Sequence, residues 1–123
     1  MRLLLDTHVA IWWDMGAPLS PLAMQAIRDA DDVFVSAASA WEIAIKAALG
    51  KISTDRSLAE LCADSGFLEL PVLMRHTDAL QSLDAIHRDP FDRLLVAQAA
   101  HEQLVLVTRD DVITRYPVAT LRA

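Results

Sequence analysis

Three short, uninterrupted apolar runs constrain the fold more than any other feature of this 123-residue sequence. They occupy residues 3–5, 33–35 and 104–107, and a segment with helical signals follows the first two and precedes the third. Runs this short and this apolar are typical of strands buried on both faces, as in a parallel sheet covered by helices. Strand and helix signals alternate along the whole chain, which predicts an α/β fold.

Local signals define the helices between these strands. Pro21 and Pro90 each stand at the first helical position behind a capping residue, where a missing amide hydrogen does no harm. Ser39 and Glu42 have the spacing of a capping box, and Gly50 is a typical residue at the end of that helix. We predict strands at residues 2–5, 33–35, 70–73 and 104–107, and helices at residues 7–13, 21–29, 39–49, 58–63, 77–83 and 90–102.

Composition favours one domain over residues 1–123, because 54% of the residues are hydrophobic and no repeat or Pro/Gly-rich linker interrupts them. No apolar stretch approaches the roughly 20 residues that a membrane span needs, and no secretory signal begins the chain. We therefore expect a soluble, cytoplasmic protein with no membrane partner. Cys62 is the single cysteine, which excludes an intrachain disulfide and a thiolate zinc cluster, and we expect it to be a small buried hydrophobe.

Four acidic residues stand beside the apolar runs and helix starts: Asp6, Glu42, Asp92 and Asp110. The carboxyl ends of parallel strands meet at one edge of a sheet, where open α/β sheets bind their ligands. Each acid alone has an ordinary explanation as a cap, a turn residue or a first-turn carboxylate. Together they would repel one another unless a cation neutralised them. Oxygen ligands without thiolates favour Mg²⁺ or Mn²⁺.

The overall charge opposes non-specific binding to nucleic acid, because the net charge is −6 and the pI is near 5.0. Any contact with nucleic acid must therefore be local. Arginines outnumber lysines nine to two, and Arg88, Arg93, Arg109 and Arg115 fall close to the acids. These four could contact phosphates, although an ion pair with a neighbouring acid is the simpler role for any one of them.

Four motifs carry a resemblance to a known family: Leu-Asp-Thr-His at 5–8, Ser-Ala-Ala-Ser-Ala-Trp-Glu-Ile-Ala-Ile-Lys at 36–46, His-Arg-Asp-Pro-Phe-Asp-Arg at 87–93, and Val-Thr-Arg-Asp at 107–110. In their order and spacing the chain resembles the PIN domain, specifically VapC-type toxins of type II toxin–antitoxin systems. The resemblance implies a three-layer α/β/α sandwich around a mainly parallel sheet. It also implies a Mg²⁺- or Mn²⁺-dependent endoribonuclease that hydrolyses RNA phosphodiester bonds.

The resemblance assigns roles to particular residues. Asp6, Glu42, Asp92 and Asp110 resemble the acidic quartet of the family, with Asp6 and Asp92 as the leading metal ligands, and Asp89 resembles an additional acid. A second group is auxiliary: Thr7 and Thr108 match hydroxyl positions that could orient a carboxylate, and Arg93 is expected to pair with a carboxylate or a phosphate.

Partners are also implied by the resemblance. VapC-type toxins are usually homodimers and are held inactive by a small antitoxin that covers the acidic groove. We therefore expect RNA as substrate, a cognate antitoxin and a homodimer. A basic antitoxin side chain could compete with the metal for the four acids.

Two alternatives remain. A phosphoacceptor receiver domain has a similar size and alternation, but it places a lysine after its last strand, whereas Lys46 and Lys51 both lie in the first half of this chain. It also places adjacent acids after its first strand, and Asp6 has none beside it. A catalytically inactive PIN-like scaffold is the other alternative, and the intact set of four acids argues against it.

The remaining aromatic and histidine residues have ordinary interpretations. Trp12, Trp13 and Trp41 are predicted to belong to the core, although Trp12 and Trp13 are adjacent and must point in different directions. One of these two could face a partner subunit. A further set is scattered and is predicted to be surface or capping histidines: His76, His87 and His101.

Overall fold

The computed structural model describes residues 1–123 and contains five strands, six α-helices and one short 3-10 helix, η1 (Ile113–Arg115). The strands are β1 (Arg2–Leu5), β2 (Asp32–Ser36), β3 (Leu68–Leu70), β4 (Val105–Thr108) and β5 (Thr120–Arg122). The helices are α1 (Thr7–Met15), α2 (Pro21–Asp29), α3 (Ala37–Ala48), α4 (Leu58–Ser65), α5 (Met74–Leu80) and α6 (Pro90–Glu102). The predicted alternation of strand and helix is confirmed.

The five strands form one sheet in the order β3-β2-β1-β4-β5, and every neighbouring pair is parallel. The strand β1 lies at the centre, where Leu3 pairs with Val33 on one side and with Val105 on the other. Leu4 and Leu5 are fully buried, as is Leu3, because helices cover both faces of a parallel sheet. The uninterrupted apolar run at the start of the chain is thus explained by its central position.

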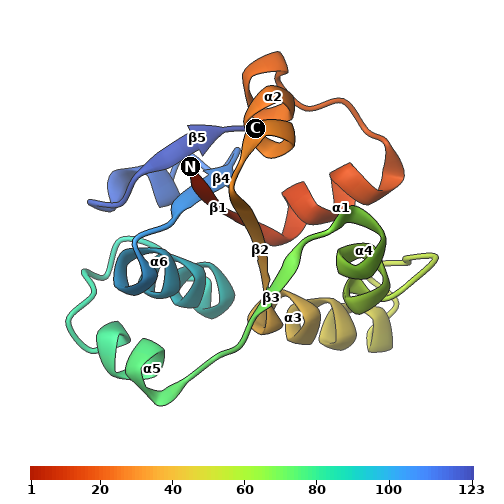
Figure 1. The fold of residues 1–123 in the computed structure, drawn as a ribbon. Helices are drawn as coiled ribbons and strands as arrows, with labels where there is room; N and C mark the ends of the chain where they lie inside the picture. Colours follow the sequence, from red (N-terminus) through yellow and green to blue (C-terminus); the bar gives the residue numbers. More distant parts are fainter.

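Helices lie on both sides of this sheet, as Figure 1 shows. Leu3 and Leu5 point into a core formed with α1, α2 and α4, whereas Leu4 points into a second core formed with α6 and η1. This division follows from the strand period of two. The helix α3 packs against α1 and α6. The predicted three-layer α/β/α sandwich is confirmed.

Helix boundaries with strong local signals agree with the sequence. The Ser20 hydroxyl accepts a hydrogen bond from Ala23 N at 3.0 Å, and Pro21 follows as the first residue of α2. Gly16 ends α1 in the left-handed conformation with a φ of 70°, a region that glycine enters at little cost, and the helix is two residues longer than the predicted 7–13. Caps of this kind are local, so the sequence suffices to place them.

The predicted capping box between Ser39 and Glu42 is wrong. The helix α3 begins at Ala37 directly after β2, and Ser36 is its N-cap, with its hydroxyl accepting from Ala38 N at 3.0 Å. Ser39 instead shares a hydrogen bond with the Thr7 hydroxyl at 2.7 Å. Because the helix starts earlier than predicted, Glu42 lies a turn deeper in it and is 3% exposed.

The less regular half of the chain departs further from the prediction. The strand predicted at 70–73 lies at 68–70, the helix predicted at 77–83 lies at 74–80, and β5 was not predicted at all. The strand β5 has three residues and a mixed burial pattern, so no apolar run marks it. It forms because its backbone pairs with β4, from Leu106 opposite Thr120 to Thr108 opposite Arg122.

The expectations for two single residues, Trp41 and Cys62, also change. Trp41 is 61% exposed and meets Phe91 edge-on at a centroid distance of 5.1 Å, so its placement in the core is wrong. Trp12 and Trp13 are half-buried against the core around α1. Cys62 is half-buried rather than buried, and burial raises the pKa of its thiol.

Candidate active site

The four predicted acids lie on elements that meet at the carboxyl end of the sheet. Asp6 follows β1 directly, Asp110 lies two residues beyond β4, Asp92 is in the first turn of α6, and Glu42 is inside α3. Asp6, Asp92 and Asp110 line one open pocket of about 370 Å³. Glu42 does not line this pocket, but it is near enough for its charge to raise the pKa of Asp92. We call this pocket, together with the nearby Glu42, the acidic groove. It brings together acids that are far apart in sequence.

Asp6 is held firmly although it is only 5% exposed. It is the N-cap of α1, and Oδ1 accepts a hydrogen bond from His8 N at 3.2 Å. Oδ2 accepts one from the Thr108 hydroxyl at 2.6 Å. Burial raises the pKa of Asp6 above its ordinary value, because desolvation outweighs these hydrogen bonds and Asp110 adds repulsion. Capping and a place in the groove are therefore compatible roles for this residue.

Asp92 has the most perturbed acidity in the groove. Burial raises the pKa of Asp92 to about 7, and the charges of Asp6, Asp89 and Glu42 add to this effect. A positive charge on His87 would act in the opposite direction but would not cancel this rise. Near neutral pH this carboxyl group is therefore divided between its protonated and ionised forms, and a nearby cation would favour the ionised form.

Glu42 contains the one buried side-chain oxygen or nitrogen atom that has no hydrogen-bond partner, Oε1. The other carboxylate oxygen, Oε2, accepts from the Lys46 ammonium group, one helical turn further on. An unpaired carboxylate oxygen in the interior is costly, so it indicates a place for a ligand. The Lys46 pKa is raised by this hydrogen bond, although burial works against the rise, and the charges of Glu42, Asp89 and Asp92 contribute.

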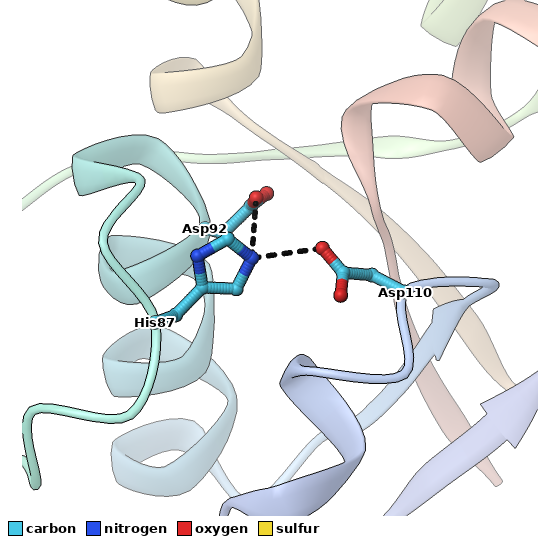
Figure 2. Close-up of side chains that lie close together, drawn as sticks. All are labelled: His87, Asp92 and Asp110. Atoms are coloured by element: carbon cyan, nitrogen blue, oxygen red, sulfur yellow. Dashed lines mark hydrogen bonds and ion pairs between the residues drawn. The ribbon is translucent and has the colours of Figure 1, made fainter.

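His87 joins the acids, although it was predicted to be only a surface or capping residue. Its Nε2 lies 2.8 Å from Asp110 Oδ2 and 3.2 Å from Asp92 Oδ2, as Figure 2 shows. Its Nδ1 accepts from Asp89 N at 3.0 Å, so Nε2 carries the proton and donates toward the carboxylates. His87, Asp92 and Asp110 each offer one atom that could bind a metal ion, and these three atoms lie within 4.8 Å of one another.

Burial opposes ionisation of Asp110, but hydrogen bonds overcome it. These come from His87 and from the amides of Val112 and Ile113, and they hold the pKa of Asp110 below its ordinary value. Asp110 Oδ1 accepts from Val112 N at 2.8 Å, while Oδ2 faces His87. One oxygen thus anchors the turn before η1, and the other faces the groove.

The auxiliary residues divide into two groups. Thr108 orients Asp6, and Asp89 caps α6 by accepting from Phe91 N at 2.8 Å and Asp92 N at 3.1 Å. Thr7 contacts Ser39 rather than a carboxylate.

Arg93 forms no ion pair with an acid, and the expected contact with a phosphate stays a prediction. It donates to the carbonyl oxygen of Asp84 at 2.9 Å and to the Tyr116 hydroxyl at 3.3 Å. Arg93 lies one position beyond Asp92, about 100° around α6, so its side chain faces away from the acids. It contacts the loop that precedes α6 and holds that loop in place.

Sequence reasoning missed His87 and Lys46 as members of this cluster. His87 stands two residues before Asp89, the cap of α6, and Lys46 follows Glu42 by the four residues of one helical turn. Neither spacing by itself shows that the side chain reaches the acids.

Comparison with known proteins bears on this geometry. The family model described as the PIN domain matches residues 3–119. The chain belongs to the PIN-domain family. Ribonuclease VapC22 of Mycobacterium tuberculosis is 37% identical to this PIN domain over 115 residues, which cover 87% of the chain and 85% of the relative.

Solved structures agree on the fold of this PIN domain. DNA-bound VapBC from Salmonella typhimurium matches with a TM-score of 0.74 and 18% identity, over 99% of this chain and 98% of that one. VapBC2 from Rickettsia felis, bound to a fragment of its promoter DNA, matches with a TM-score of 0.73 and 14% identity over the same shares.

In this PIN domain the longest helix, α6, has 13 residues, and no helix meets the length and hydropathy of a membrane span.

Proposed function

We propose that this PIN domain is a metal-dependent endoribonuclease that hydrolyses RNA phosphodiester bonds and serves as the toxin of a toxin–antitoxin pair. The single observation that carries the proposal is the unpaired Oε1 of Glu42 beside a carboxyl group, Asp92, whose pKa is raised to about 7. A cluster built in this way is suited to hold a cation. The identity with Ribonuclease VapC22 supports RNA as the substrate.

The donor set suits a hard divalent ion. Carboxylate oxygens predominate and no thiolate is near, which favours Mg²⁺ or Mn²⁺ over softer metals. Asp6 and Asp92 are the leading ligands, with Glu42 and Asp110 completing the set directly or through water. When bound, such an ion lowers the pKa of a coordinated water and stabilises the negative charge that develops at the phosphate.

The chain's own residues position this chemistry. The Thr108 hydroxyl fixes one oxygen of Asp6, and the amide of Val112 fixes one oxygen of Asp110. Each carboxylate thereby keeps one orientation, which lowers the entropic cost of assembling the site. Asp92 gives up its carboxyl proton when a cation approaches, because the cation removes the repulsion that raises its pKa.

Partners follow from the same relatives. The structural matches from Salmonella typhimurium and Rickettsia felis are VapBC assemblies, so we extend the expectation of an antitoxin partner to this chain. A homodimer, a cytoplasmic location and a single nuclease domain over residues 1–123 remain part of the proposal. The inactive-scaffold alternative has less support, because a binding scaffold does not need a cluster of acids that repel one another.

The test compares wild type with Asp6→Asn after expression in cells, by sequencing the 5′ ends of cellular RNA. Asparagine keeps the size of the side chain and an oxygen to cap α1, but it removes the charge that a metal requires. We expect discrete cuts in the wild-type sample and none with Asp6→Asn. Asp78→Asn, an exposed change on α5, is the matched control and should cut like the wild type. Equal patterns for wild type and Asp6→Asn would overturn the proposal.

A further inference from the structure

Arg109 differs from the other charged residues that line the acidic pocket. It shares the pocket with Asp6, Asp92, Asp110, His8 and Trp12, yet no Asp or Glu side chain forms an ion pair with it. Its neighbour Asp110 is engaged by His87 instead. A guanidinium group that no acidic side chain neutralises can bind an anionic ligand in this pocket.

The guanidinium group of Arg109 is fixed in place. Nε donates to Ala123 O at 2.9 Å, and Nη2 donates to Pro18 O at 2.7 Å. The group lies over the ring of Trp12, with Cζ 4.4 Å from the ring centroid. These contacts hold the group by one edge and one face, so little rotamer entropy remains to be lost when a ligand binds.

The opposite edge of this guanidinium is free. Arginine has five N–H donors, and the two carbonyl contacts use the edge shared by Nε and Nη2. Both hydrogens of Nη1 and one of Nη2 therefore remain on the other edge, in the fork that matches two phosphate oxygens.

The other arginines near the acids lack this arrangement. Arg93 is occupied by carbonyl oxygens, and Arg88 and Arg115 are exposed.

We propose that Arg109, supported by Trp12, binds a non-scissile phosphate of the RNA strand, next to the phosphate that the acids and their metal receive. This inference rests on the proposed function. The groove is otherwise acidic and the whole chain carries −6, so a single fixed cation at its edge gives the strand both an attachment point and a direction. Within this proposal Trp12 acts as a positioning residue, because its ring holds the guanidinium group of Arg109 in place.

The experiment measures binding and cleavage separately. Binding of a fluorescent 12-nucleotide RNA pool of random sequence is followed by anisotropy in Mg²⁺, in the Asp6→Asn background, over a range of salt concentrations. We expect Arg109→Gln to weaken binding about tenfold. The slope of log affinity against log salt should become shallower by about 0.7, which is the value for one phosphate contact on a single strand. Trp12→Leu should weaken binding less.

Two controls keep the result interpretable. Arg28→Gln removes the same charge from an exposed position on α2, which leads to the opposite end of the sheet, and should match its parent in affinity and slope. Arg109→Lys keeps the charge without the fork, so affinity should be intermediate with the parental slope. This variant also serves if Arg109→Gln melts at a markedly lower temperature.

The outcomes separate the two proposals. If Arg109→Gln and Arg28→Gln have the same affinity and salt slope, the proposed phosphate contact is overturned. Weaker binding of Arg109→Gln with an unchanged slope would also overturn it, because that result would indicate base stacking. Cleavage is assayed on the same pool with the variants in the otherwise native chain. Binding that depends on Arg109 without any cleavage by the native chain would support the phosphate site while contradicting the endoribonuclease.

Discussion

Two clusters of buried polar side chains contrast in this molecule, one beside α5 and one in the acidic groove. In the first, the Ser36 hydroxyl donates to Gln98 Oε1 at 2.6 Å, and Gln98 Nε2 donates to Pro71 O at 3.2 Å. His76 accepts from Leu73 N through Nδ1, and its Nε2 lies 2.9 Å from Glu102. Every buried side-chain polar atom of this cluster has a partner.

The acidic groove is the opposite case. Glu42 leaves one buried oxygen unbonded, and Asp92 is ionised only in part near pH 7. A satisfied network stabilises a fold, whereas an unsatisfied one lowers stability unless a ligand completes it. Burial alone therefore does not mark a functional polar group, whereas a buried polar atom without a hydrogen-bond partner does.

The largest expected effect is on activity. Asp6→Asn should reduce RNA cleavage by about 10³-fold, equivalent to about 4 kcal/mol of transition-state stabilisation, because it removes a leading metal ligand. The melting temperature without metal should stay the same or rise, since a buried repelling charge is lost. Cleavage assays and thermal melting with a chelator measure both. A marked drop in melting temperature would mean that Asp6 is structural.

A divalent metal ion should stabilise the protein through the acidic groove. Mg²⁺ at about 100 times its dissociation constant should add about 2.7 kcal/mol to the free energy of unfolding, provided the unfolded chain does not bind it. In Glu42→Gln the gain at the same concentration should be much smaller. Urea denaturation with and without Mg²⁺ gives the two values. An equal response in wild type and variant would exclude Glu42 from the site.

Breaking the satisfied cluster should cost stability and spare activity. Gln98→Met keeps the length of the side chain but leaves the Ser36 hydroxyl and the Pro71 carbonyl without their partner. The free energy of unfolding should fall by about 2 kcal/mol, in urea denaturation. Cleavage at a temperature where the variant is folded should remain near the wild-type rate. A neutral effect on stability would remove the contrast between the clusters.

The smallest effect concerns pH. The pKa of Asp92 rises from 3.8 to about 7 on folding, so between these values the folded protein binds more protons than the unfolded chain. The free energy of unfolding of the metal-free protein should therefore fall as pH rises through this range. After allowance for solvent screening, we expect about 1 kcal/mol from this residue. Asp92→Asn should flatten the profile relative to wild type, and parallel profiles would contradict the assignment.

Prediction from sequence succeeded where the signal was local. The strand at residues 2–5 and the helix capped by Asp89 and Pro90 were placed correctly, because apolar runs and caps act on adjacent residues. It failed for β5, which exists only through pairing with β4. It also failed for the start of α3, where Ser36 is the cap and the predicted cap, Ser39, shares a hydrogen bond with Thr7 instead.

The candidate site shows the same division. The convergence of Asp6, Asp92 and Asp110 could be predicted, because each stands near a strand end or helix start at the same edge of the sheet. The participation of His87 could not be predicted, because its contact with Asp110 depends on the conformation of the loop before α6, which Arg93 holds through the carbonyl oxygen of Asp84. The fixed position of Arg109 depends on Pro18 and Ala123, which lie 91 and 14 residues away in sequence.

The parallel sheet, the acids at its carboxyl edge and the kind of metal that they suit could all be inferred from the residues, because hydrophobic periodicity and ligand chemistry belong to individual segments. The folded structure was needed to show which oxygen has no partner, which carboxyl group has its pKa raised to about 7, and which arginine lies against Trp12 without an acidic side chain as partner. Those properties arise from burial and from distances between segments, and both exist only once the chain has folded.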